Sequence, residues 1–175
     1  FEGGSSASLI IRDSIFTNNE HRSDITFAAA SNGDLDISGC QFLNGPSFWW
    51  SLYIYGTISQ RISNCTWDNW LGGTNRALIH IENIDGIMYI DQIVMRNSIS
   101  RGIVFYGDDG NGGLGTTDEP TLSVTNSTFT NLYLVGDPGT AISTVGPNII
   151  IKDCVFESIT GWKGSAIYLN EPGNK

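Results

Sequence analysis

The sequence is poor in charged residues and has no long hydrophobic run. Lys and Arg number 9 and Asp and Glu 18 among 175 residues, so charged residues make up 15%, below the usual quarter. With 40% hydrophobic residues, this composition excludes intrinsic disorder. The net charge of −9 would repel a phosphate backbone, so we expect no nucleic-acid partner. No apolar run exceeds four residues, the three isoleucines at 149–151 included, which is too short to span a bilayer.

Cysteine and histidine are also scarce. Three Cys without a CxxC pair predict neither a disulfide scaffold nor a zinc site, and we expect no cofactor. Neither of the two histidines is a candidate catalytic residue, because we expect His80 on the outer face of a strand and His21 in a turn. The chain opens on Phe1 with no secretory signal pattern. We therefore expect a processed product, a fragment or a repeat taken from a longer chain.

What the sequence has is an internal repeat. Six segments align without gaps on a large anchor residue, and the anchors recur at a nearly constant spacing with one longer interval after Met95: Phe16, Phe42, Trp67, Met95, Phe129 and Phe156. Positions −7, −5, −2 and 0 relative to the anchor are apolar or small, which is the period-2 alternation of a strand with one interruption. The interruption at −3 holds mostly Asn, Asp or Gly, which tolerate a left-handed backbone and so predict a sharp bend.

A second set of short strands lies between these segments, at 24–29, 51–56, 77–82, 102–107, 139–145 and 164–169. Each repeat thus holds about three strands, and helix formers are outnumbered by β-branched residues, Asn and Gly. A β-sandwich would also have short strands, but it gives no reason for the same residue types at the same offset six times. We predict an all-β, right-handed parallel β-helix of about six coils. It forms one domain over 1–175, with a loop insertion at 107–120.

The pattern resembles the right-handed β-helix (pectin-lyase-like) superfamily. Its repeat style is similar to that of polymorphic outer-membrane proteins and related surface β-helices, which combine a G-x-A-I strand with an F-x-N or F-x-x-N strand. The matching segments are Gly139-Thr140-Ala141-Ile142, Gly164-Ser165-Ala166-Ile167, Phe16-Thr17-Asn18-Asn19, Phe42-Leu43-Asn44 and Phe129-Thr130-Asn131. The resemblance covers essentially the whole chain and implies an architecture, whereas one fold hosts many activities.

Two ladders follow from the repeat. The Asn residues two positions after the anchor are predicted to stack as a structural ladder, in which their amides satisfy the backbone groups of a buried turn. The alternative is that they form a polar binding stripe. These residues are Asn18, Asn44, Asn69, Asn97 and Asn131. Cys40 and Cys65 occupy equivalent inward positions of adjacent coils. There we expect free thiols that pack as small hydrophobes, with a Cys40–Cys65 bridge as the minority case; the redox state of these two and of Cys154 stays open.

Two N-x-S/T sequons, at Asn64 and Asn126, place their Asn at the −3 bend. If the chain follows a eukaryotic secretory route, we expect these residues to carry glycan; in a bacterial surface protein they are plain turn residues. Aromatic residues three to eight positions after the anchors are expected along one edge of the solenoid: Trp49, Trp50, Trp70, Tyr133 and Trp162. Such side chains either contact a glycan or a protein partner, or cover an open corner of the core.

No catalytic residue can be nominated. The G-H-G and R-I-K motifs that galacturonan hydrolases of this fold share are missing, and the acids on the strands do not converge at one offset in neighbouring coils: Asp24, Asp36, Glu82 and Asp91. A glycosidase needs two carboxyl groups across a bound sugar. The insertion offers Asp108, Asp109 and Asn111 as candidate Ca²⁺ ligands, although we favour a solvated loop.

Three functions are compatible with the sequence. We predict a non-catalytic structural module of an extracellular or cell-surface β-helix protein, either a filament subunit that stacks end to end or an adhesin stalk. Its expected partners are copies of itself or neighbouring β-helix coils, because neither end of the sequence carries a recognisable cap. The alternatives are a carbohydrate-binding or polysaccharide-cleaving domain, and an enzyme fragment whose catalytic coils lie elsewhere.

Overall fold

The structure is a computed structural model, and it describes most of the repeat. The described residues are 2–3, 8–19, 23–29, 34–45, 50–56, 59–71, 77–82, 86–106, 121–134, 140–145, 148–162 and 165–170. Every regular element among them is a β-strand, and every strand pairing is parallel. The predicted all-β class is therefore confirmed.

The strands form three parallel sheets, A, B and C. Sheet A has seven strands, β1 (Glu2–Gly3), β4 (Ser23–Ala29), β7 (Trp50–Tyr55), β10 (Ala77–Glu82), β13 (Arg101–Tyr106), β16 (Ile142–Val145) and β19 (Ile167–Asn170). Sheet B has six strands, β2 (Ser8–Arg12), β5 (Asp34–Ser38), β8 (Ser59–Ser63), β11 (Ile87–Asp91), β14 (Thr121–Thr125) and β17 (Asn148–Lys152). Sheet C has six strands, β3 (Ile15–Thr17), β6 (Gln41–Leu43), β9 (Thr66–Asp68), β12 (Val94–Ser98), β15 (Thr128–Leu132) and β18 (Val155–Glu157).

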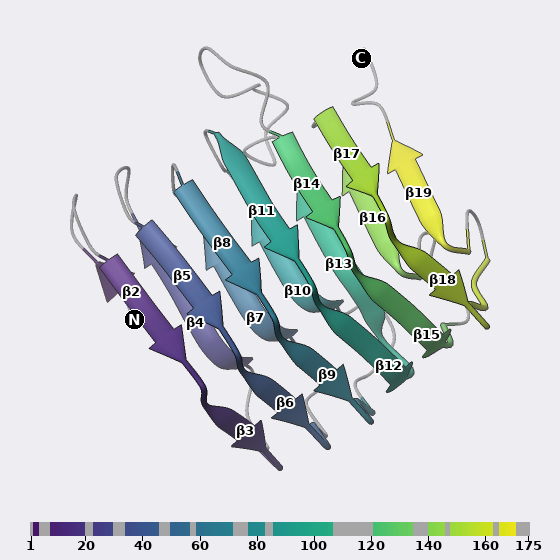
Figure 1. The fold of residues 1–175 in the computed structure, drawn as a ribbon, viewed down its shortest axis with the longest axis horizontal. Coiled ribbons are helices and arrows are strands. Elements are labelled where there is room, and N and C mark those ends of the chain that lie inside the picture. The colour runs from purple at the N-terminus through teal and green to yellow at the C-terminus, as the bar shows by residue number, and fades with distance from the viewer. Residues whose placement is uncertain are drawn as a thin grey trace.

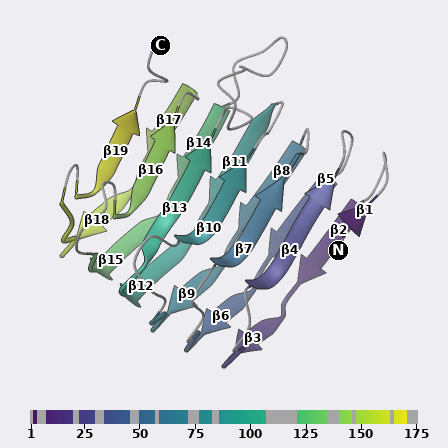
Figure 2. The ribbon, with the colours of Figure 1, turned by 180° about the vertical axis from the view of Figure 1, so that it is seen from behind.

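The chain passes through sheets A, B and C in turn and adds one strand to each sheet in every coil. This path makes a right-handed solenoid of about six coils (Figure 1). Sheet A lies behind sheets B and C in that view and in front when the molecule is turned (Figure 2). The predicted coil of three short strands is confirmed. The strands of sheet A differ from prediction by a few positions at their ends: β16, for example, begins at Ile142 rather than at 139.

The bend between sheets B and C depends on a left-handed backbone. All six residues at −3 have positive φ, from 49° at Asp13 to 64° at Gly39, as the sequence predicted. The +2 position adopts the same conformation in every coil, with φ from 53° at Ser158 to 56° at Asn69. Because Asn enters this region at lower cost than most residues, the recurrent Asn at +2 is explained by backbone geometry.

The predicted Asn ladder forms only in part, and it is not buried. Asn69 donates to Asn44 over 2.7 Å and Asn131 donates to Asn97 over 3.2 Å. Between these pairs the ladder is broken, because the Asn97 amide donates to Asp68 instead. All five Asn are exposed, so the interpretation of a buried turn was wrong: these amides stabilise an exposed bend.

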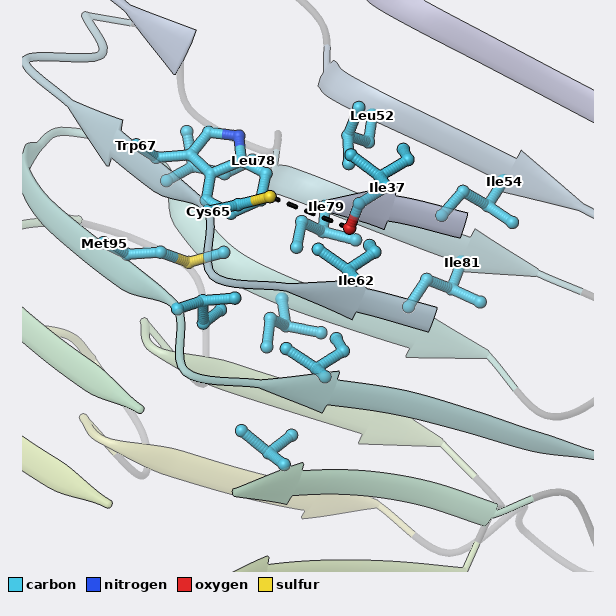
Figure 3. Close-up of a cluster of buried hydrophobic side chains, with 14 of the residues drawn as sticks. Ile37, Leu52, Ile54, Ile62, Cys65, Trp67, Leu78, Ile79, Ile81 and Met95 are labelled. Carbon is cyan, nitrogen blue, oxygen red and sulfur yellow. Dashed lines mark hydrogen bonds between the residues drawn. The ribbon is translucent and has the colours of Figure 1, made fainter. Parts of the chain in front are cut away.

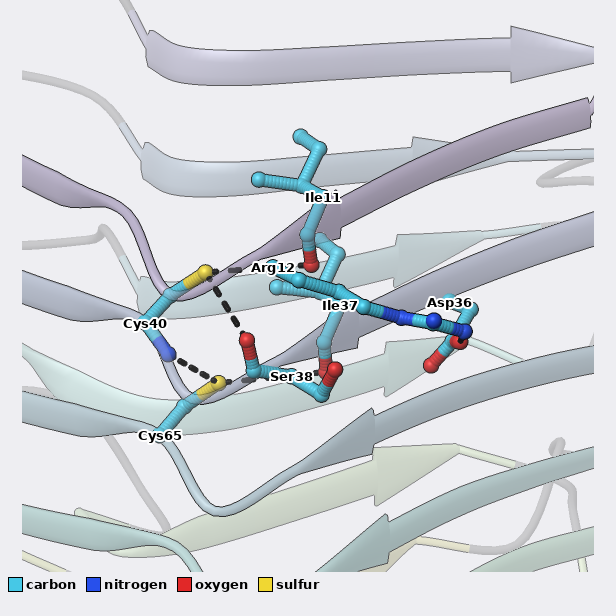
Figure 4. Close-up of polar contacts among 7 residues, drawn as sticks. All are labelled: Ile11, Arg12, Asp36, Ile37, Ser38, Cys40 and Cys65. Atoms are coloured by element: carbon cyan, nitrogen blue, oxygen red, sulfur yellow. Dashed lines mark hydrogen bonds and ion pairs between the residues drawn. The ribbon is translucent and has the colours of Figure 1, made fainter.

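In five of the six coils the −2 residue is Ser or Cys, whose side chain donates a hydrogen bond across the bend; Ile93 is the exception. Cys40 Sγ donates to the carbonyl of Ser38 over 3.3 Å, and Cys65 Sγ to the carbonyl of Ser63 over 3.2 Å (Figure 4). Ser14, Ser127 and Cys154 make the same bond to the carbonyl two residues earlier. All three cysteines are free thiols, so the expectation of thiols is confirmed, and their weak donor capacity explains why Ser and Cys exchange at this position.

The core consists of stacked layers of equivalent residues, with those of successive coils in contact (Figure 3). The anchor residues stack as rings: Phe42 lies 4.9 Å from Phe16 and 4.7 Å from Trp67, nearly parallel to both. Phe129 and Phe156 repeat this geometry at 5.0 Å. The Ile and Val residues at −5 form a second stack, in which Ile37 and Ile62 are fully buried.

Gln60 departs from the expected apolar pattern at −7. It occupies the inward row of sheet B between Leu35 and Met88, is 1% exposed, and neither atom of its amide group has a hydrogen-bond partner. A buried polar group without a partner costs about 1–3 kcal/mol. Leu35 and Met88 on the neighbouring strands offer the amide no hydrogen-bond partner, so they do not offset this cost.

Candidate functional site

The outer face of sheet A carries a cluster of aromatic rings around one carboxylate. Strand register places Tyr53 beside His80 and Glu82 beside Tyr106. Because alternate residues of a strand share a face, His80 and Glu82 both point away from the core, whereas Ile79 and Ile81 point into it. Three neighbouring strands, β7, β10 and β13, therefore supply one surface, which we call the ring cluster: Trp50, Tyr53, His80, Glu82 and Tyr106.

The rings of this cluster contact one another directly. Trp50 stacks on Tyr53 with centroids 4.6 Å apart and an angle of 21°. Trp50 also lies 4.9 Å from the His80 ring, and Tyr106 lies 5.5 Å from it on the next strand. The rings enclose His80, which is buried although it faces outward, while Trp50, Tyr53 and Tyr106 keep part of their surface exposed. The cluster is thus a preformed aromatic platform.

Glu82 organises the polar side of the platform. His80 Nε2 lies 2.5 Å from Oε1 of Glu82, and the Tyr53 hydroxyl donates to Oε2 over 3.0 Å. The hydrogen bond to His80 lowers the pKa of Glu82, while burial together with the bond to Glu82 raises the pKa of Tyr53 to about 12. An ionised carboxylate that already accepts two hydrogen bonds is suited to binding and is a poor general acid, which must hold a proton near neutral pH.

A second polar chain fixes the corner next to the platform. The Trp67 indole donates to Ser51 Oγ over 3.0 Å, and Ser51 donates to Asp24 over 3.0 Å. Asn19 donates to the other Asp24 oxygen over 2.7 Å, and burial raises the pKa of Asp24. Because Ser51 follows Trp50 directly, this chain positions the first strand residue of the ring cluster.

The ring cluster was not predicted from the sequence. His80 was expected on the outer face of its strand, and it lies there, but its neighbours were not recognised. The signal was present in the second strand set. Aligning 51–56, 77–82 and 102–107 by their apolar residues places Tyr53 beside His80 and Glu82 beside Tyr106, in the register that the structure shows.

The predicted edge of aromatics does not form as one surface. Trp50 belongs to the ring cluster. Trp70 is 1% exposed and lies in the core, which agrees with the alternative that these aromatics cover a corner of the core. Its ring lies against Gly45, where a side chain would overlap it. Tyr133 and Trp162 are exposed, whereas Trp49 falls outside the described residues.

Both sequon residues lie on the surface. Asn64 and Asn126 are exposed at the left-handed bends between sheets B and C. The Asn126 amide nitrogen, to which a glycan would be attached, donates to Asp91 over 2.9 Å. The structure thus leaves both residues accessible to modification.

A shallow hollow of about 440 Å³ lies on the outer face of sheet B, with Asp36, Arg61 and Tyr89 in its lining. Asp36 is already paired with Arg12 over 2.8 Å.

Within the described part of the chain, no His, Cys, Asp and Glu side chains gather as a metal site. The candidate Ca²⁺ ligands Asp108, Asp109 and Asn111 lie outside the described residues, as does His21. Nor do the described residues include a helix that is long and apolar enough to cross a membrane.

No family model, no curated protein and no solved structure matches this chain. The fold class that the geometry defines is the parallel β-solenoid.

Proposed function

We propose that the chain is a non-catalytic structural module of an extracellular or cell-surface β-helix protein of the right-handed, pectin-lyase-like type. Such a module serves as a length of stiff rod, either in a filament or in an adhesin stalk. The observation that carries the proposal is the continuous core. The anchor residues and the aliphatic residues at −5 are fully buried from the second coil to the fifth, and three parallel sheets enclose them. Such a stack of coils forms a stiff rod along its axis.

The exposed sequons at Asn64 and Asn126 fit a surface location, because an oligosaccharide requires an accessible Asn.

Electron microscopy of material isolated from its source, combined with labelling of intact cells by a reagent that cannot cross membranes, tests this function. The expected result is labelled protein in rods whose coils repeat at about 4.8 Å along the axis. Isolated short particles inside the cell would overturn the proposal. Mass spectrometry of the same material would report glycan at Asn64 and Asn126.

The ring cluster favours a second candidate function, the binding of carbohydrate. Partly exposed rings beside an ionised carboxylate present both an apolar surface for a sugar face and an acceptor for its hydroxyl groups. A glycan array with the wild-type chain and the Trp50→Ala variant tests this function. Binding that is lost in Trp50→Ala but kept in Tyr89→Ala, which removes an exposed ring from sheet B, would support it; absence of binding by the wild-type chain would exclude it.

A further inference from the structure

Glu82 lies between two tyrosines on the outer face of sheet A. Strand register places Tyr55 of β7 on one side of it and Tyr106 of β13 on the other. Tyr55 is 41% exposed, and Tyr106 is partly exposed. With Trp50 and Tyr53, which also belong to β7, they give the carboxylate aromatic neighbours from both adjacent strands.

The carboxylate of Glu82 keeps capacity for a ligand. Its side chain is 33% exposed, and its two oxygen atoms each accept one hydrogen bond, from His80 and from Tyr53. An ionised carboxylate offers about four acceptor positions. The two bonds within the chain therefore leave acceptor positions for a donor that a ligand brings.

The charge of Glu82 is not offset by a basic side chain. Among the residues that the structure describes, no Lys or Arg forms an ion pair with Glu82, whose charged contact is the imidazole of His80. Asp36, by comparison, is paired with Arg12 over 2.8 Å. The chain as a whole carries a net charge of −9. The site and the whole molecule therefore both attract a cation and repel an anion.

The aromatic rings add to this attraction. The face of a Trp or Tyr ring is electrostatically negative and attracts an ammonium group, most strongly for Trp. The same rings offer an apolar surface to the face of a sugar. A neutral sugar would use the apolar surface without the charge, and an acidic sugar would be repelled by Glu82. A sugar that carries an ammonium group uses the rings and the carboxylate together.

From this combination we infer that the ring cluster, extended by Tyr55, binds an amino sugar in its ammonium form. The ammonium group donates hydrogen bonds to the carboxylate of Glu82, and the sugar ring lies against the partly exposed aromatic rings. The inference rests on the second function proposed above, carbohydrate binding, and names the class of ligand.

Three tetrasaccharides that differ in one substituent test the inference by isothermal titration calorimetry near neutral pH. Cellotetraose and the tetramers of N-acetylglucosamine and glucosamine share one β-linked backbone, and carry a hydroxyl, an acetamido or an amino group on the second carbon of each sugar. We expect the glucosamine tetramer to bind roughly tenfold more tightly than the other two. This preference should shrink as NaCl rises, because salt screens partly exposed charges.

Two matched variants locate the preference. Glu82→Gln removes the charge but keeps the length of the side chain and an oxygen that accepts from Tyr53, so it should bind the glucosamine tetramer no more tightly than cellotetraose. Glu157→Gln removes an exposed carboxylate from sheet C and changes the net charge by the same amount, so it should keep the preference. Circular dichroism melts confirm that both variants fold.

The outcomes separate the ligand from the function. Equal affinity for the three tetrasaccharides overturns the inference and leaves carbohydrate binding standing. If none of the three binds, the inference is overturned, and the glycan array decides the function separately. A preference that survives in Glu82→Gln arises elsewhere on the molecule and also overturns it. Tetralysine that competes as strongly as the glucosamine tetramer does so too, since a cation without a sugar would then be sufficient.

Discussion

Removing one ring from the middle of the anchor stack tests the layered core quantitatively. Phe42 is fully buried and stacks on both sides, against Phe16 at 4.9 Å and Trp67 at 4.7 Å. Truncation of a buried Phe to Ala costs about 3–5 kcal/mol, and each stacked ring pair contributes roughly 0.5–1.5 kcal/mol beyond burial. Since Phe42→Ala loses two pairs, we expect a cost of about 5 kcal/mol, at the top of that range.

The end of the stack supplies the matched control. Phe16 has one stacked neighbour and is only partly buried, so Phe16→Ala should cost about half as much, roughly 2–2.5 kcal/mol. Urea unfolding followed by circular dichroism gives both free energies. The measurement belongs at low protein concentration, where contact between chains is disfavoured and the exposure of Phe16 is that of the single chain.

The ratio of the two costs is the informative quantity. A twofold difference means that the free energy of the core is set by neighbours on both sides, as in a stack of identical layers. Equal costs for Phe42→Ala and Phe16→Ala would refute the reasoning, because they would mean that burial between two coils contributes no more than burial against one.

Three further predictions concern register, thiol chemistry and pH. Ile37→Asp should leave the chain unfolded by circular dichroism, since it buries an unpaired charge, whereas Ser38→Asp on the opposite face should change stability by less than about 0.5 kcal/mol; a folded Ile37→Asp chain contradicts the register. Burial raises the pKa of the Cys65 thiol to about 12, so alkylation at pH 8 should be roughly a thousandfold slower than in urea, and equal rates would contradict that burial. Hydrogen bonding to His80 lowers the pKa of Glu82, so its contribution to stability is present above the pKa of the unfolded chain and is lost as pH falls through the lower folded value. Glu82→Gln should therefore flatten the acid side of a plot of melting temperature against pH, and an unchanged profile would rule out this coupling.

The solenoid was predictable because its information is local and repeated. A residue that must face inward in one coil must face inward in the next, so the six anchors and the aliphatic residues at −5 reveal both period and register. The left-handed bends were predictable for a similar reason, since Asn, Asp and Gly recur at −3 where the backbone has positive φ. Gln60 shows the limit of the pattern, because the stack buries it despite its polar amide.

The surfaces were predicted less well, since outward residues obey no common constraint. The sequence left open whether Trp70 contacts a partner or covers the core. The structure shows it buried against Gly45, an outcome that depends on the absence of a side chain in the preceding coil. The ring cluster likewise depends on which strands become neighbours. Tyr53 and His80 lie one coil apart in the sequence and meet only through the register of sheet A.

The sequence alone therefore determined the class of fold, the number of coils, the position of the bend between sheets B and C and most of the inward rows, because each coil obeys the same steric and hydrophobic rules. Only the tertiary structure decided which outward residues become neighbours. Stacking brings Tyr53, His80 and Glu82 into contact, and it leaves Ile15 and Val155 exposed at opposite ends. The reason is that the interior of a coil is specified within a single repeat of the sequence, while a surface is created by several coils together.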